Sequence, residues 1–289
     1  MIIAVASGKG GTGKTTIAAS LVEVLHEEQQ GAMLLDADVE APNAHLTLAP
    51  EFQEEQPVHL RIPLIEEETC TGCGLCSEVC AFNALVQLGG TPMLFPDLCH
   101  GCGSCVLICP EGAIEEQAYR LGKLEGGMTA EGIRFGRGMM DIGRPMAVPI
   151  IAELKEWMLG PGGPGVVIDA PPGSSCPVVE SLRGADFVLL VTEPTPFGLH
   201  DLQAAYRVTQ EVGLPAGVII NRDGIGDQRV EEFCREVGLP VMLRIPFSRE
   251  IGEGLAQGRS LLEVLPEYRD HFRDLIRTIE AGVKDGAGW

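Results

Sequence analysis

Short apolar runs alternate with longer amphipathic stretches along most of this chain. The apolar runs lie at residues 2–6, 32–36, 165–169, 186–192, 216–220 and 241–245. Each has the length and composition of a strand that is buried on both faces, as in a parallel sheet covered by helices. Amphipathic segments such as 17–25, 227–237 and 266–283 predict helices between them. The alternation predicts an α/β fold with a doubly wound, mostly parallel sheet.

The alternation stops near residue 49. Residues 51–57 are acidic and turn-prone, a cysteine-rich region follows, and a helical pattern resumes at residues 149–159. We therefore expect a discontinuous domain of residues 1–60 and 120–289, with residues 61–119 as an inserted domain. Segment 120–148 is rich in glycine and arginine, and we expect it to return the chain as strands. It serves either as a contact surface between the two domains or as a plain connection.

A glycine-rich stretch, GKGGTGKTT at residues 8–16, lies between the first strand and the first helix. It has the GxxxxGK[ST] spacing of a P-loop in the strand–loop–helix context that this motif requires. Lys14 would reach the β- and γ-phosphates of ATP, and Thr15 would ligate Mg²⁺. The residues expected to bind the nucleotide through this loop are Gly8, Gly10, Gly11, Thr12, Gly13, Lys14, Thr15 and Thr16.

Three aspartates follow apolar strands at positions suited to phosphate chemistry. Asp36 and Asp38 come after the second apolar run, and Asp169 ends the run at 165–169. In open α/β sheets, ligands bind at the carboxyl ends of the strands. We expect Asp36 and Asp38 to lie where Mg²⁺ and the γ-phosphate would bind, and Asp169 to belong to the Mg²⁺ site. The alternative is that Asp36 and Asp38 only cap the end of a strand.

Eight of the ten cysteines form two sets with the spacing C-x₂-C-x₂-C-x₃-C. This is the bacterial ferredoxin pattern, in which the fourth cysteine of each set ligates the other cluster. It predicts two [4Fe-4S] clusters in a small α+β domain, one held by Cys70, Cys73, Cys76 and Cys109, the other by Cys99, Cys102, Cys105 and Cys80. Zinc is the weaker alternative, since its sites usually use two CxxC pairs. The first set ends in Cys80-Ala81, where the second ends in Cys109-Pro110.

A second lysine, Lys9, gives the loop the form GKGGxGKT, which resembles the deviant Walker A motif of the MinD/Mrp ATPase superfamily. This superfamily also includes the nitrogenase iron protein. The resemblance implies a dimer with ATP at the interface, into which Lys9 reaches across from one subunit to the other. It further implies that Asp36 holds a magnesium-bound water and Asp38 orients the attacking water. Gly173, in the motif DxPPG, would donate its N–H to the γ-phosphate, and Asn221 would read the adenine.

Composition restricts the partners of the protein. The chain has 289 residues and a net charge of −20, which argues against nucleic acid and anionic lipid as ligands. No apolar run is long enough to cross a bilayer, and the first residues read as a core strand, so we expect a cytoplasmic protein without a stable membrane anchor. The tail 284–289 lacks the basic amphipathic helix that ends MinD. We expect Cys234 to be buried, and Cys176 to be a small buried residue or a cluster ligand.

Three functions remain open at this stage. The favoured one is an ATP-binding and ATP-hydrolysing iron–sulfur protein that couples a nucleotide-dependent dimer to electron transfer. The dimer would be a homodimer or a heterodimer with a paralogue, and the hydrolysis slow or stimulated by a redox or metalloenzyme partner. The second is a factor for iron–sulfur or metallocofactor assembly. The third is a MinD-like spatial regulator with a redox-sensing ferredoxin domain.

Overall fold

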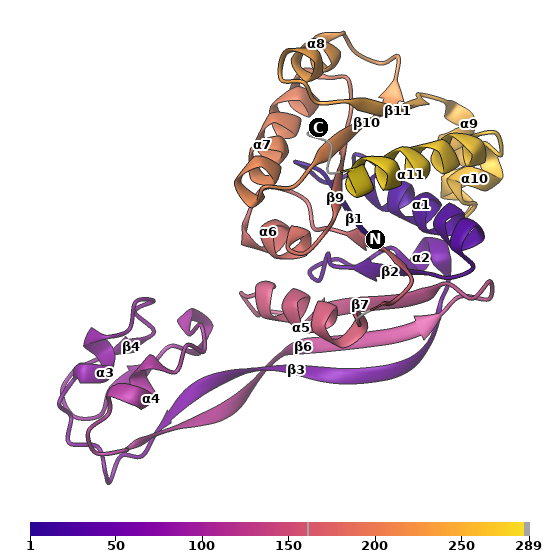
Figure 1. Cartoon of the computed structure of the whole chain (residues 1–289). Helices are drawn as coiled ribbons and strands as arrows, with labels where there is room; N and C mark the ends of the chain where they lie inside the picture. The colour runs from indigo at the N-terminus through magenta and orange to yellow at the C-terminus, as the bar shows by residue number, and fades with distance from the viewer. Residues whose placement is uncertain (161, 286–289) are drawn as a thin grey trace.

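A nine-stranded sheet forms the centre of the computed structural model, which describes residues 1–160 and 162–285 (Figure 1). The strands follow the order β11-β10-β9-β1-β8-β2-β7-β6-β3, and those from β11 to β7 run parallel. Their bounds are β1 (Ile2–Ala6), β2 (Ala32–Asp36), β3 (Glu51–Ile65), β6 (Ile114–Met128), β7 (Arg134–Met140), β8 (Gly165–Asp169), β9 (Phe187–Thr192), β10 (Ala216–Asp223) and β11 (Val241–Pro246). The predicted mostly parallel sheet is confirmed.

Helices cover both faces of the sheet, as the all-apolar strands require. One face carries α1 (Lys14–Gln29), α9 (Arg249–Ala256), α10 (Leu261–Val264) and α11 (Tyr268–Asp285). The opposite face carries α5 (Val148–Met158), α6 (Cys176–Leu182), α7 (Pro196–Val212) and α8 (Arg229–Glu236). Among the described residues, no helix has the length and apolarity needed to span a membrane. Pro161 and residues 286–289 of the predicted tail lie outside the described residues.

Strands β3 and β6 form a long antiparallel hairpin at one edge of the sheet, paired from Glu51–Met128 to Ile65–Ile114. Residues 51–57, which we expected as a turn-prone linker, are therefore part of a strand. The expected domain boundaries at 60/61 and 119/120 fall inside β3 and β6, which run through them without a break. Pro57 and Pro63 are compatible with β3 because it is the outermost strand.

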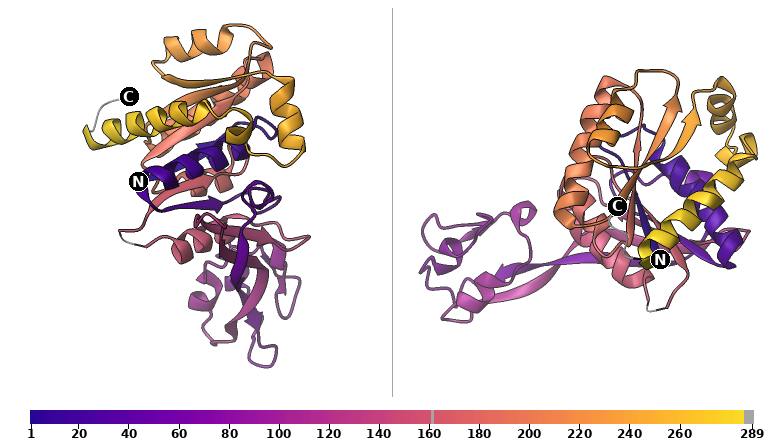
Figure 2. Two further views of the ribbon diagram at one scale, coloured as in Figure 1. Left: turned by 90° about the vertical axis from the view of Figure 1, so that its right-hand side faces the viewer. Right: turned by 45° about the horizontal axis from the view of Figure 1, so that its top comes forward.

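The hairpin carries residues 66–113, here called the cysteine lobe, at its far end and away from the nucleotide-binding part of the chain (Figures 1 and 2). The lobe contains α3 (Leu75–Glu78), α4 (Ser104–Ile108), the short pair β4 (Leu85–Val86) and β5 (Met93–Leu94), and a 3₁₀ turn at Pro96–Leu98. Cys99 and Ala84 belong to the same apolar core as Leu60 and Ile62 of β3. The half of the lobe around Cys99 is therefore packed against the hairpin.

Candidate functional site

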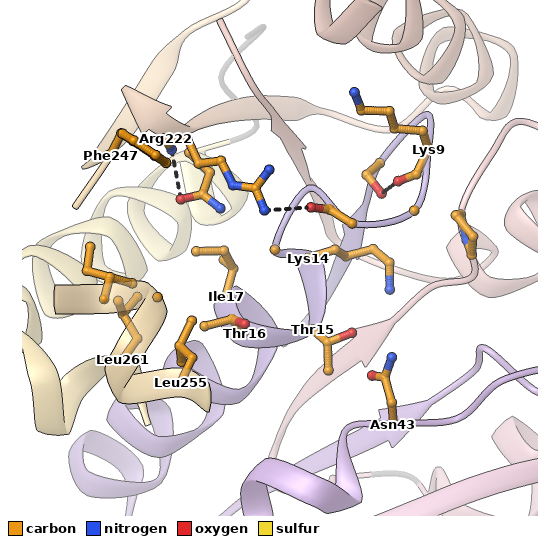
Figure 3. Close-up of a pocket in the computed structure, with 18 of the residues that line it drawn as sticks. Lys9, Lys14, Thr15, Thr16, Ile17, Asn43, Arg222, Phe247, Leu255 and Leu261 are labelled. Carbon is orange, nitrogen blue, oxygen red and sulfur yellow. Dashed lines mark hydrogen bonds between the residues drawn. The ribbon is translucent and has the colours of Figure 1, made fainter. Parts of the chain in front are cut away.

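The predicted P-loop lies between β1 and α1 and lines a cavity of about 470 Å³ (Figure 3). Gly11 and Gly13 have positive φ angles of 79° and 89°, which turn the backbone toward the cavity. A Cβ on Gly13 would lie 2.3 Å from Asn221 Nδ2, so both the angle and the close approach require glycine. The free N–H groups at the start of α1 give this cavity the character of an anion site.

Lys14 forms a buried ion pair with Asp169 at the end of β8. Its ammonium points into the same space as the side chains of Thr15 and Asn43 (Figure 3). The second carboxylate oxygen of Asp169, Oδ2, is buried and has no hydrogen-bond partner among the described residues. An unpaired buried carboxylate oxygen is costly unless a cation or a donor completes it. This oxygen therefore fits the predicted role of Asp169 in a Mg²⁺ site.

Asp36 is fully buried at the end of β2, and its carboxylate organises the following loop. Its Oδ2 accepts hydrogen bonds from the backbone N–H groups of Asn43 and Ala44, both at 2.9 Å, and its Oδ1 accepts one from Asp38 at 3.2 Å. Burial and the neighbouring charge of Asp169 raise the pKa of Asp36 to about 7. Asp36 thus holds the loop, as the capping alternative expects, and it lies beside Asp169.

Asp38 is half-buried and lines the cavity together with Lys14 and Thr15. Burial raises the pKa of Asp38 above its ordinary value, while the charge of Lys14 acts in the opposite direction. The structure therefore brings the predicted phosphate-binding lysine, the hydroxyl of Thr15 and three carboxylates to one end of the sheet. Oxygen ligands of this kind are those that Mg²⁺ prefers, with a nucleotide supplying phosphate oxygens.

The side chain of Lys9 extends away from that of Lys14 (Figure 3). Its ammonium lies 3.5 Å from Glu193 Oε2, and about a third of the side chain is exposed. Glu193 also pairs with Arg222, whose guanidinium donates to the carbonyl of Gly11 at 3.2 Å. Sequence reasoning missed both Glu193 and Arg222. Glu193 directly follows β9 and Arg222 is the penultimate residue of β10, so their positions at strand ends were a signal, but local patterns do not show that the two strands bring them together.

Two predicted nucleotide contacts have protein partners in this structure. The Gly173 N–H donates to the carbonyl of Ser7 at 3.0 Å, so it is not free for a γ-phosphate. The Asn221 side-chain amide donates to the Thr12 carbonyl at 2.7 Å and accepts from Arg222 N–H at 2.9 Å. Asn221 lines the cavity, but here it fixes the phosphate loop to β10. These two hydrogen bonds use one of the two N–H donors and one of the two acceptor lone pairs of the amide, so the predicted contact with adenine would fall to the remaining ones.

The two sets of cysteines predicted to share clusters lie around two separate cavities in the cysteine lobe. One cavity is lined by Cys70, Cys73, Cys76 and Cys109, and the other by Cys80, Cys99, Cys102 and Cys105. The fourth cysteine of each sequence repeat thus lies with the first three of the other. Gly72, Gly74, Gly101 and Gly103 all have positive φ angles in the loops that bring these thiols together.

The thiols do not converge on a single point. Among the described residues, no three His, Cys, Asp or Glu side chains are placed to hold one metal ion. In a [4Fe-4S] cluster each of four thiolates binds its own iron atom, so the ligands surround a cube instead of meeting at one centre. The arrangement around each cavity fits that requirement in ligand type and number.

The other two cysteines lie apart from these cavities. Cys234 is buried on α8, as predicted, and burial raises the pKa of its thiol to about 11. Cys176 is exposed at the start of α6, so the expectation of a small buried residue is wrong. It starts the helix that follows β8, and it lines neither of the two cysteine cavities.

A phosphate loop after the first strand of a mostly parallel sheet, with a lysine–aspartate pair beneath it, defines a P-loop nucleotide-binding protein. Residues 3–261 match the family described as the CobQ/CobB/MinD/ParA nucleotide binding domain. The chain belongs to this family.

Relatives extend over nearly the whole chain. An uncharacterized protein of Methanocaldococcus jannaschii is 32% identical over 280 residues, covering 96% of this chain and 97% of its own length. The iron-sulfur cluster carrier protein of Aquifex aeolicus is 24% identical, covering 98% of this chain and 69% of its own. Among solved structures, the septum site-determining protein MinD of Pyrococcus horikoshii in complex with Mg-ADP superposes with a TM-score of 0.60, at 22% identity and 98% coverage of both chains.

Proposed function

We propose that this protein is an ATP-hydrolysing iron–sulfur protein in which a nucleotide-dependent dimer controls electron transfer through two [4Fe-4S] clusters. The observation that carries the proposal is the pair of cavities, each lined by four cysteines, with the fourth residues exchanged between repeats. Two complete, crossed ligand sets are typical of electron-carrying ferredoxins. The cysteine lobe would then be the inserted ferredoxin domain.

The charge of the lobe supports a protein partner of opposite sign. Residues 62–119 contain no lysine or arginine but include Glu66, Glu67, Glu68, Glu78 and Glu111. Exposed apolar side chains accompany these carboxylates, among them Leu88, at 75%, and Leu107, at 89%. An acidic surface with apolar centres favours a redox or metalloenzyme partner with a basic docking face. The same charge opposes nucleic acid, and a cytoplasmic location remains our expectation.

The nucleotide cavity supports the ATPase part of the proposal. Lys14, Thr15, Asp36 and Asp169 would hold ATP and Mg²⁺, and bound Mg²⁺ would neutralise phosphate charge. Asp38, which lines the cavity, would orient the attacking water molecule. Lys9 pairs with Glu193 in the single chain, and its partly exposed side chain would exchange this partner for the nucleotide of a second subunit. Hydrolysis would then be slow until a partner subunit completes the site.

The decisive experiment is a measurement of the cluster potentials in three nucleotide states. The full chain is reconstituted anaerobically, and iron and sulfide are counted. EPR-monitored titrations follow without nucleotide, with MgADP and with a non-hydrolysable MgATP analogue. A shift of about 60 mV, which corresponds to about 1.4 kcal/mol for a one-electron centre, is the expected result. A chain that binds fewer than two clusters, or potentials that do not depend on nucleotide, would contradict the proposal.

A second candidate function is the delivery of iron–sulfur clusters to other proteins. Cys73 and Cys102 are exposed, which gives an acceptor access to one thiolate of each set. The name of the Aquifex relative points the same way for that protein. Cluster lability separates the two functions, because a carrier loses iron to an apo-acceptor on mixing and an electron-transfer protein keeps it.

A further inference from the structure

The loop 141–147, which joins β7 to α5, lies between the nucleotide cavity and the cysteine lobe. Where it begins, the Met140 N–H donates to the carbonyl of Val39 at 2.8 Å, and Val39 directly follows Asp38. The buried Val39 side chain also packs on β7, since a Cβ on Gly138 would lie 2.6 Å from Val39 Cγ1. The segment that carries Asp38 and the start of the loop are therefore held together.

Further along the loop, Arg144 contacts the lobe. Its guanidinium lies over the ring of Tyr119, 4.1 Å from the centroid, and donates to the Tyr119 hydroxyl. That hydroxyl donates to Asp97 Oδ1 at 2.9 Å, and Arg144 Nη1 lies 3.9 Å from the same oxygen. Asp97 belongs to the 3₁₀ turn two residues before Cys99. We call Arg144, Tyr119 and Asp97 the Arg144 clamp.

The loop between these two attachments is bonded to β6 at its first residue, where the Asp141 N–H donates to the carbonyl of Leu121 at 2.9 Å, and is more lightly anchored beyond it. Ile142 is fully exposed, and Gly143 has a φ angle of 82° with open space where a Cβ would lie. A further surface ion pair joins Asp141 to Arg120 of β6 at 2.9 Å. Exposed pairs of this kind are weak, so the loop can move without disturbing the packing of the apolar core.

We propose that loop 141–147 transmits the nucleotide state to the cysteine lobe, with the Arg144 clamp as its contact. The inference rests on the proposed function, in which the cavity binds ATP and the lobe holds clusters. A nucleotide that draws in the segment of Asp38 moves Val39 and Met140 with it and changes the position of Arg144 over Tyr119. The 3₁₀ turn that precedes Cys99 then loses or gains the contact of its Asp97 with Arg144. The coupling acts through two contacts, the hydrogen bond between Met140 and Val39 at one end of the loop and the Arg144 clamp at the other.

Hydrogen exchange of the full, cluster-reconstituted chain tests this coupling, with MgADP compared against a non-hydrolysable MgATP analogue. Peptides covering 38–45 report the nucleotide site, and peptides covering 95–101 report the turn before Cys99. In the unmodified protein, exchange in 95–101 is expected to change about threefold between the two states. Arg144→Gln should abolish that change and leave the response of 38–45 intact. Tyr119→Phe, which keeps the ring, should reduce it.

Arg229→Gln, at the start of α8, is the matched control. It removes the same kind of group from an exposed ion pair with Asp227. A response of 95–101 that persists in Arg144→Gln, or is absent in the unmodified protein while 38–45 responds, overturns the clamp and leaves the proposed function standing. A chain without iron refutes the cluster function, whatever the exchange shows. A lack of response at 38–45 refutes both.

Discussion

Lys14 and Asp169 form a buried ion pair beside the nucleotide cavity. Lys14 is 7% exposed and Asp169 is fully buried, and Asp36 lies close enough for its pKa to respond to Asp169. Two carboxylates buried side by side repel each other unless a cation lies between or beside them. The lysine that is expected to bind phosphate thus also stabilises the protein before any nucleotide arrives.

Lys14→Met should therefore destabilise the nucleotide-free protein by about 3 kcal/mol, because removing one partner leaves a buried charge uncompensated. It should also abolish ATP binding. Urea unfolding at pH 8, followed by circular dichroism, measures the first effect and titration calorimetry the second. Lys9→Met is the matched control, since the pair of Lys9 with Glu193 is partly exposed and its loss should change stability by less than about 1 kcal/mol. Equal effects of the two substitutions would contradict this account.

Glu23 of α1 is a largely buried residue whose ionisation destabilises the folded protein. It lies in a polar cavity with Glu27, Glu131 and Glu263, and burial is the main cause that raises its pKa from 4.5 to about 7. Below pH 4.5 the carboxyl is protonated in both the folded and the unfolded chain. Between pH 4.5 and 7 only the unfolded chain releases the proton, so the stability of the folded state falls as the pH rises.

Glu23→Gln should accordingly stabilise the protein by about 3 kcal/mol at pH 8 and leave it unchanged at pH 4. Unfolding free energies measured across this range would show the gain appearing between pH 4.5 and 7. Glu236→Gln, an exposed residue at the end of α8, provides the control and should show no such dependence. A constant difference between Glu23→Gln and the unmodified protein at all pH values would show that burial of Glu23 is not the cause.

The two cysteine repeats are predicted to exchange their fourth cysteines, and this exchange can be tested directly. If Cys109 completes the set of Cys70, Cys73 and Cys76, the variant Cys73→Ser/Cys109→Ser damages one cluster only and should keep about four iron atoms. Cys73→Ser/Cys80→Ser damages both clusters and should keep almost none. Ligation within each repeat reverses these two iron counts. Cys176→Ser, whose thiol lies outside both cavities, should keep all the iron.

The same elements show what the sequence could reveal. The parallel strands, the P-loop and the exchanged cysteines follow from short local patterns, and the structure contains them at the expected places. Strand β3 was missed because Glu51, Glu54 and Glu55 face water on an edge strand. Its signal was the alternation of buried Val58, Leu60 and Ile62. Glu193 and Arg222 were missed because their roles depend on distant strands meeting at one edge, which local patterns do not encode.

At the scale of the whole molecule, the proposed function requires a second subunit at the nucleotide-binding face. In the single chain Lys9 pairs with Glu193 of its own subunit. Several large apolar side chains beyond the carboxyl ends of strands are exposed around the same face. They are Ile142 after β7, Phe197 after β9 and Phe247 after β11. This face therefore has exposed apolar area, and the partly exposed Lys9–Glu193 pair, that a second subunit would cover.

A nucleotide-dependent dimer is thus expected, with Lys9 transferred from Glu193 to the opposite nucleotide. With a non-hydrolysable MgATP analogue, light scattering should show twice the monomer mass for the unmodified protein and the monomer mass for Lys9→Ala. Nucleotide affinity of the Lys9→Ala monomer should change less than about threefold. Lys123→Ala, which removes a lysine paired with Glu55 and Glu125 on the hairpin, should still dimerise. A dimer formed by Lys9→Ala would contradict the transfer.

The β3–β6 hairpin can also convert a small rotation at the sheet into a displacement of the cysteine lobe. Each strand has 15 residues, and β6 pairs with β7 from Gly122 to Met128, so about eight residues of each strand extend beyond the sheet. At about 3.3 Å per residue this part reaches roughly 26 Å. A rotation of about 5° where it leaves the sheet would move the tip by about 2 Å. Under the proposed function, such a displacement would change the distance between the cysteine lobe and a docked partner.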